Sequence, residues 1–199
     1  MAGAAAGAPR PRLNARMAAT HWPAVAAAIS TGVVAAVYVG KLPPALPALS
    51  AEFGLSLVAA GWVVSMFNAI ATAGAIFIGV LADRAGAYRS CIAGLALLVL
   101  GGTVGAAATG PAWLLASRFI EGIGFVTVSV SAASLIFAAA AAADRKLALA
   151  VWSTYMPFGF ALTLFAAPAL IAAAGWRGLW LAAIALALAC AAWLAAARR

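Results

Sequence analysis

The stretch GVLADRAGAYRS, residues 79–90, is a polar interruption between two long apolar segments. Its distinctive residues are one acid, two arginines and two glycines, namely Gly79, Asp83, Arg84, Gly86 and Arg89. Only 8% of the 199 residues are charged, so this short stretch holds a large share of the available charge. Because charges are costly in lipid, the pattern predicts a turn at a membrane surface.

The composition agrees with a membrane protein. Hydrophobic residues make up 67% of the chain and the mean hydropathy is +1.12, against about 45–50% apolar residues in a soluble domain. The net charge of +8 does not indicate nucleic-acid binding, because the basic residues lie at the ends of apolar runs and form no stripe. The two cysteines, Cys91 and Cys190, are expected to act as small hydrophobic residues.

Apolar runs long enough to cross a bilayer divide the chain. A hydrocarbon core of about 30 Å needs about 20 apolar residues in a helix. The sequence contains six such runs, at Trp22–Gly40, Leu57–Leu81, Cys91–Thr109, Ala112–Ala143, Leu147–Ala174 and Leu179–Ala197. We therefore predict an all-α polytopic protein with a disordered tail at 1–21, a six-helix transmembrane domain at 22–197 and a cytoplasmic end at 198–199.

The positive charges predict the orientation, because Lys and Arg in short loops mark the cytoplasmic side. With a cytoplasmic N-terminus, nine basic residues lie inside and only Lys41 and Arg177 lie outside. The first 21 residues also lack the order of a secretory signal. We expect a multi-pass protein of the bacterial cytoplasmic (inner) membrane with both termini in the cytoplasm.

Each residue type in the opening stretch has a physical role in such a turn. Gly86 allows a chain reversal or a positive φ, and Gly79 allows a second helix to approach closely. Asp83 is expected to accept hydrogen bonds from free amides at the start of a helix, either its own or a neighbouring one. Arg84 and Arg89 keep the turn at the cytoplasmic surface.

The pattern G-x-L-A-D-R-x-G-x-x-R at residues 79–89 resembles the signature loop of the major facilitator superfamily of secondary transporters, here with a single Arg89 in place of a basic run. Other stretches resemble the same family: KLPPALPALSAEFGLS at 41–56 its first external loop, RFIEGIGF at 118–125 its R-x-x-x-G pattern in helix four, and GWRGLW at 175–180 its connection into helix six. The resemblance implies the amino-terminal six-helix half of a carrier.

Two ionisable residues fall inside the fourth predicted span. Arg118 needs a partner in the membrane, and Glu121 at i+3 shares its helix face. The pair either fixes packing alone or faces a central cavity, where Arg118 binds an anionic group or controls the Glu121 proton. If transport is coupled to protons through this half, Glu121 is the expected proton carrier.

Other polar and aromatic residues are expected to have either a pathway role or a structural role. Asn68, at the middle of the second span, binds either the substrate or a neighbouring helix. Tyr155 is a candidate cavity residue, whereas Tyr38 and Trp152 are expected to anchor helix ends at the interface. His21 is expected to be an interfacial histidine without a role in proton transfer.

The stretch WSTYMPFGFALTLFAAP, residues 152–168, contains two prolines and one glycine within one predicted span, so a bent helix is expected. It lacks the glycine-proline-glycine-glycine pattern of the superfamily's drug antiporters. It is weakly similar to bacterial carriers of the cyanate-permease type.

These features predict a secondary active transporter that moves a small solute by alternating access, coupled to protons in one version of the hypothesis. The alternative is a half-length subunit without transport, or a fragment of a 12-helix transporter. Enzyme function is not expected, because no nucleotide loop, metal-ligand cluster or catalytic triad is present in the sequence. The expected partners are membrane lipid, a solute and a second six-helix half, either a copy of this chain or a separate chain; no cofactor, metal or nucleic acid is expected.

Overall fold

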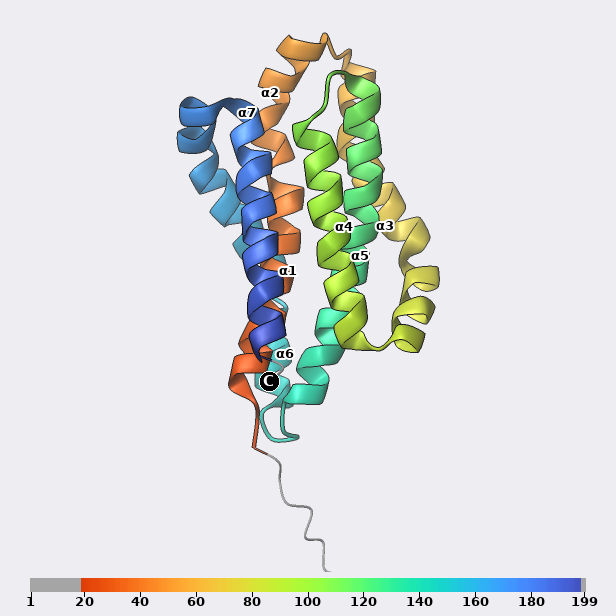
Figure 1. The fold of residues 1–199 in the computed structure, drawn as a ribbon, viewed down its shortest axis with the longest axis vertical. Coiled ribbons are helices and arrows are strands. Elements are labelled where there is room, and N and C mark those ends of the chain that lie inside the picture. The colour runs from red at the N-terminus through yellow and green to blue at the C-terminus, as the bar shows by residue number, and fades with distance from the viewer. Residues whose placement is uncertain (1–18, 198–199) are drawn as a thin grey trace, which may run out of the picture.

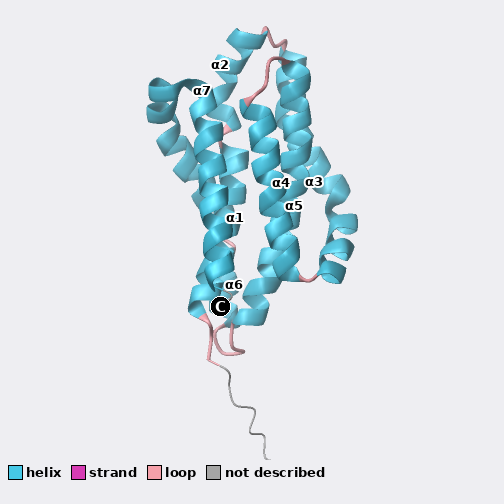
Figure 2. Ribbon diagram, viewed as in Figure 1, coloured by secondary structure: helices cyan, strands magenta, loops and turns pink. Residues whose placement is uncertain are grey.

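A computed structural model describes residues 19–197. All regular secondary structure in this range is helical (Figure 2), so the predicted all-α class is confirmed. The predicted tail falls largely on residues 1–18, and the predicted cytoplasmic end on residues 198–199; both lie outside the described residues.

Seven helices follow one another in the described part of the chain: α1 (Trp22–Gly40), α2 (Leu42–Phe53), α3 (Leu57–Ala85), α4 (Ala87–Ala106), α5 (Pro111–Ala139), α6 (Arg145–Trp152) and α7 (Tyr155–Ala197). Helix α2 continues α1 after Lys41, and the two together form one long apolar helix. Helix α6 and the first part of α7 likewise follow one another within one apolar segment.

Helix α7 contains a reversal that makes it two membrane passes. The backbone is not helical at Ala174 and Gly175, and Gly175 has a φ of +65°. Glycine adopts this conformation without the steric cost that a side chain would bring. The chain therefore crosses six times, as the sequence predicts, but the sixth helix begins just after Gly175, some residues before the predicted Leu179.

The break between α6 and α7 follows from proline. Pro157 has no N–H, so the helix loses a backbone hydrogen bond at Ser153, and the chain forms a turn at residues 153–154. The predicted bend in this span is confirmed at its first proline. Pro168 lies inside α7 without a break in the helix.

The six passes alternate in direction, and both ends of the described chain lie at the lower end of the bundle in Figure 1. Helices α4 and α5 pack side by side through glycines. A Cβ on Gly94 would lie 2.9 Å from the backbone nitrogen of Val128, and one on Gly124 would lie 3.0 Å from the carbonyl oxygen of Gly94. Small residues at such contacts let two membrane helices approach closely.

The turn between α3 and α4 is a single residue. Gly86 has a φ of +86° and separates Ala85, the last residue of α3, from Ala87, the first of α4. The predicted need for glycine at this reversal is confirmed. The prediction of a longer turn over 79–90 is wrong, because the rest of the stretch extends the two helices beyond their apolar parts.

The predicted external loop at 41–56 is also mostly wrong, since Leu42–Phe53 is helical. Pro43 stands at the start of α2, shortly after the turn residue Lys41, and proline is tolerated in the first turn of a helix. At the far end of α2, Glu52 accepts a 2.6 Å hydrogen bond from Trp176 and forms a 2.9 Å ion pair with Arg177. This contact joins α2 to the reversal in α7.

One cluster of buried apolar residues joins α1, α4, α5 and the second part of α7. A second joins α2 and α3 to α5 and to the region of the α7 reversal. Cys91 and Cys190 are buried in the first cluster as free thiols, as predicted. In contrast, α3 and the first part of α7 leave large apolar side chains exposed, among them Ile76, Phe77, Phe158 and Phe165.

Candidate functional site

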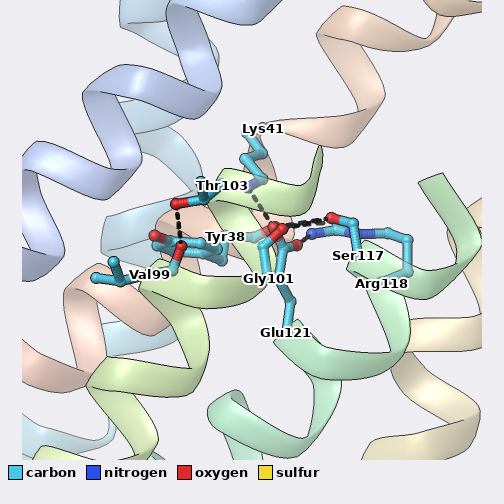
Figure 3. Close-up of polar contacts among 8 residues, drawn as sticks. All are labelled: Tyr38, Lys41, Val99, Gly101, Thr103, Ser117, Arg118 and Glu121. Carbon is cyan, nitrogen blue, oxygen red and sulfur yellow. Dashed lines mark hydrogen bonds and ion pairs between the residues drawn. The ribbon is translucent and has the colours of Figure 1, made fainter. Parts of the chain in front are cut away.

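Three charged side chains meet in the interior of the bundle. Lys41, between α1 and α2, places its Nζ 2.7 Å from Oε1 of Glu121 on α5. Arg118, one turn before Glu121 on the same helix, forms an ion pair with Oε2 of that carboxylate. The side chains of Lys41 and Glu121 are fully buried, and that of Arg118 is 2% exposed. One carboxylate is thus shared by two buried cations (Figure 3).

Aromatic rings and one backbone carbonyl surround these cations. The Lys41 ammonium lies 4.1 Å from the ring centre of Tyr38 and 4.5 Å from that of Trp180. The Arg118 guanidinium lies 5.2 Å from the ring centre of Phe67 and donates a 3.3 Å hydrogen bond to the carbonyl oxygen of Tyr38. Ring faces attract cations, most strongly where water is excluded.

Helix α4 packs against the side chains of Glu121 and Ser117. The hydroxyl oxygen of Ser117 lies 2.9 Å from the Gly101 carbonyl oxygen and 3.3 Å from Oε1 of Glu121, so its single hydrogen is shared between these two acceptors. A Cβ on Gly101 would lie 2.6 Å from Cγ of Glu121. Glycine at this position therefore leaves the room that the Glu121 side chain occupies.

The cluster holds two basic groups, those of Lys41 and Arg118, and one acidic group, that of Glu121. A buried charge is costly unless it is paired. The Nε of Arg118 is also buried and has no hydrogen-bond partner within residues 19–197.

A cavity of about 240 Å³ lies beside Arg118. Its wall is mainly apolar, with Arg118 and Asn68 as the residues that bring polar groups. The apolar lining includes Val39, Leu42, Phe67 and Phe160. The cavity is formed by α1, α2, α3, α5 and α7, so helices far apart in sequence contribute to one wall.

The structure brings together three of the four predicted pathway residues. Arg118 and Glu121 form the predicted pair, and Asn68 lines the cavity beside Arg118. Asn68 is exposed and forms no hydrogen bond with another described residue, so its alternative role in joining two helices is not supported.

Tyr155 does not line this cavity. Its ring stacks on that of Trp152 at 4.2 Å between ring centres, and its hydroxyl lies 3.4 Å from Oγ of Ser129.

Two residues of the cluster are not among the predicted pathway residues. The sequence predicts Lys41 in the external loop and Tyr38 as an anchor at the interface, but both are fully buried. The assignments are wrong because α2 continues α1 beyond the first apolar run, which leaves Lys41 in the middle of a 32-residue helical segment. The sequence signal was the set of apolar residues on both sides of Lys41.

The residues of the predicted loop motif lie outside this cluster. Asp83 lies in the last turn of α3, exposed, and forms no hydrogen bond or ion pair with another described residue. The prediction that it caps its own helix is wrong, because a helix end presents carbonyl groups. Gly79 makes no close helix contact, since no atom lies within 4 Å of a Cβ built there. Arg84 and Arg89 are exposed.

Metal binding finds no support in residues 19–197, where no group of three or more His, Cys, Asp or Glu side chains is placed to hold an ion. The chemistry available in the cluster is therefore that of its own charges: ion pairing, hydrogen bonding and proton binding by Glu121.

Comparisons with known proteins identify relatives among transporters. The arabinose-proton symporter of Escherichia coli (strain K12) is 31% identical over 155 residues, which cover 78% of this chain and 33% of that protein. The methylenomycin A resistance protein of Bacillus subtilis (strain 168) is 32% identical over 130 residues, or 64% of this chain and 27% of that protein. This chain thus spans well under half the length of these relatives.

A solved structure has the same fold. The proton:xylose symporter XylE bound to 6-bromo-6-deoxy-D-glucose superposes with a TM-score of 0.73 at 20% identity, over 89% of this chain and 44% of that chain. Residues 23–199 match the sequence profile of the Major Facilitator Superfamily. Since this match covers nearly all of the described chain, and the solved relative shares its arrangement of helices, the protein is a multi-pass membrane protein that belongs to the Major Facilitator Superfamily.

Proposed function

We propose that this chain forms the amino-terminal six-helix half of a secondary active transporter, which moves a small solute across the bacterial inner membrane by alternating access. The observation that carries the proposal is the buried Lys41–Glu121–Arg118 cluster next to an open cavity. Ionisable residues inside a membrane protein mark substrate or ion pathways by default.

The cluster has the properties of a two-state element. Glu121 has two cationic partners on different segments, so its carboxylate retains one partner when the other moves away. Protonation of Glu121 weakens both ion pairs at once, because a neutral carboxyl group attracts neither cation. This coupling between proton binding and the contacts of α1, α2 and α5 supports proton-coupled transport in this half.

The distribution of charge supports an orientation with both termini in the cytoplasm. Arg84 and Arg89 lie in the helix ends on either side of the α3–α4 turn, and Arg145 and Lys146 lie at the start of α6. Both places are at the end of the bundle where the described chain begins and ends (Figure 1). Arg177 lies at the opposite end, in the reversal of α7. Basic residues in short loops favour the cytoplasmic side.

A second six-helix half completes the transporter in this proposal. Carriers of this kind bind their solute between two halves related by an axis along the membrane normal, and one half supplies one wall of the cavity. The exposed apolar side chains of α3 and the first part of α7 offer a surface for that half or for lipid. A second copy of this chain, a separate chain or a continuation of this chain provides it. Asp83, which forms no hydrogen bond or ion pair with another described residue, is available to accept amide hydrogen bonds from the other half.

A transport assay tests the proposal. We would express the chain in a host strain that lacks its own copy of the gene and measure accumulation and export of labelled sugars, amino acids, organic anions and amphipathic drugs. We expect movement of at least one solute class, its loss in Arg118→Gln, and its retention in Lys146→Gln, which removes an exposed charge. No movement of any class would favour the non-transporting subunit or fragment. Equal transport by Arg118→Gln would show that the cluster is not part of the pathway.

Cross-linking in native membranes tests the pairing. Phe165 is 89% exposed, so Phe165→Cys places a thiol on the surface of α7. Ala167→Cys is the control on the same helix, because Ala167 is fully buried. A cross-linked dimer or a cross-linked second chain only with Phe165→Cys supports pairing, and a purely monomeric species that still transports would refute it.

A further inference from the structure

Another cavity, of about 300 Å³, lies between α3, α4 and α5 near the turn that joins α3 to α4 (Figure 1). We propose that it binds one anionic phospholipid of the cytoplasmic leaflet, with an acyl chain in the cavity and the headgroup phosphate on Arg89. The inference takes the orientation of the chain from the proposed function, but it does not depend on which solute the protein moves.

The wall of this cavity is apolar apart from three residues. Its apolar residues include Ile78, Leu81, Leu97 and Ile123. The hydroxyls of Ser90 and Thr127 also line it, but each donates its proton to a backbone carbonyl oxygen, at 3.3 Å and 2.8 Å. Arg89 is therefore the lining residue whose polar group is available to a ligand.

Arg89 supplies a positive charge at one end of the cavity. It is exposed and forms no hydrogen bond or ion pair with another described residue. A guanidinium group stays protonated in proteins and binds a phosphate group through two parallel hydrogen bonds. Arg84, across the Gly86 turn, is also exposed, and the neighbouring Asp83 offsets one of these two charges. Basic pockets between membrane helices on the cytoplasmic side bind the headgroups of anionic lipids.

The depth of the cavity corresponds to most of one leaflet. Its lining runs from Arg89 to Leu97 along α4 and from Ala85 to Ile78 along α3. At 1.5 Å per residue, these stretches are about 10–12 Å long, against about 15 Å for half of the hydrocarbon core. The charged group lies at the end near the turn and the apolar residues continue into the bundle, which is the order of headgroup and acyl chain in a phospholipid.

The width of the cavity favours an acyl chain over a helix of another protein segment. Its volume, spread over that depth, gives a mean cross-section of roughly 25–30 Å², whereas a helix about 10 Å across needs roughly 80 Å². An apolar wall alone does not select one lipid, because surrounding acyl chains are equally apolar. Selectivity must therefore come from the headgroup, through Arg89.

Phosphatidylglycerol and phosphatidylethanolamine with the same oleoyl chains provide the test, because they differ in net charge and not in their chains. The full chain, purified in detergent, would be titrated with each lipid, and bound copies would be counted by native mass spectrometry. We expect phosphatidylglycerol to bind about fivefold more tightly, the preference that one basic residue gives near an anionic surface. Arg89→Gln should remove this preference. Lys146→Gln, which removes another exposed charge, should leave it unchanged.

A second variant tests the place of the acyl chain. Ala93 is exposed and lines the cavity, so Ala93→Leu should fill part of it and weaken the binding of both lipids while the charge of Arg89 stays. Ala96→Leu is the control, because Ala96 is exposed on the same helix but does not line the cavity. Soluble glycerol 3-phosphate, which has the charge without the chains, should not displace the lipid at equal concentration.

Equal binding of the two lipids to the unmodified chain would overturn the inference. An equal loss of preference in Arg89→Gln and Lys146→Gln, unchanged binding in Ala93→Leu, or displacement by glycerol 3-phosphate would do the same. Labelling of Arg89→Cys by an impermeant thiol reagent outside intact cells would refute the cytoplasmic orientation and the inference together. A chain that binds phosphatidylglycerol as expected but moves no solute would keep this inference while the proposed transport function fails.

Discussion

Replacing Glu121 by glutamine tests whether the carboxylate holds the two buried cations in place. The change keeps the shape of the side chain but leaves Lys41 and Arg118, which are 0% and 2% exposed, without a counter-charge. Removing one partner of a buried ion pair costs about 3–5 kcal/mol. For a chain of this size, 1 kcal/mol shifts the Tm by roughly 2–4 °C, so the melting temperature should fall by roughly 6–20 °C.

A second substitution makes the reasoning sharper. Lys41→Met in the unmodified chain loses one ion pair and two ring contacts, so it should lower the Tm. In the Glu121→Gln background the same change removes an unpaired buried cation, so it should raise the Tm. Thermal unfolding in detergent, followed by circular dichroism, gives all four values of this cycle. A Tm loss below about 2 °C for Glu121→Gln, or a loss from Lys41→Met in both backgrounds, would refute the electrostatic account.

Three further predictions concern transport and packing. Asp83→Asn should insert and fold normally but slow the conformational cycle, because its charge is proposed to bind amides of the second half; unchanged transport at equal expression would contradict this. Glu121→Gln should abolish proton-driven accumulation while sparing solute exchange, since an amide does not carry a proton; if accumulation in vesicles with an imposed proton gradient survives, the coupling site lies elsewhere. Gly159→Ala should destabilise the bundle by about 1–3 kcal/mol, because its Cβ would lie 2.5 Å from the Val33 carbonyl oxygen. The control Gly61→Ala, with no atom within 4 Å of its Cβ, should not lower the Tm.

Several features of this protein follow from the sequence alone. A bilayer requires long apolar segments with their backbone hydrogen bonds satisfied internally, so the six passes and their approximate bounds can be read from hydropathy. Gly86 can be identified as the reversal because a charged stretch with a glycine separates two such segments. The pairing of Arg118 with Glu121 is also local, since residues three apart share a helix face.

Tertiary structure decided which residues join that pair and which face the cavity. Lys41 lies 80 positions before Glu121, and no local pattern connects them. Helices in a membrane are apolar on their lipid-facing and core-facing sides alike, so periodicity does not distinguish the buried Tyr38 from the exposed Phe165. The sequence of residues 42–53 does not distinguish a loop from a helix. Its prolines favour a break in a helix, but proline is also common in the first turn of a helix. The packing of α1 against α5 brings Lys41 to the carboxylate that Arg118 already contacts. Pairing matters at this place because a buried charge without a partner is costly.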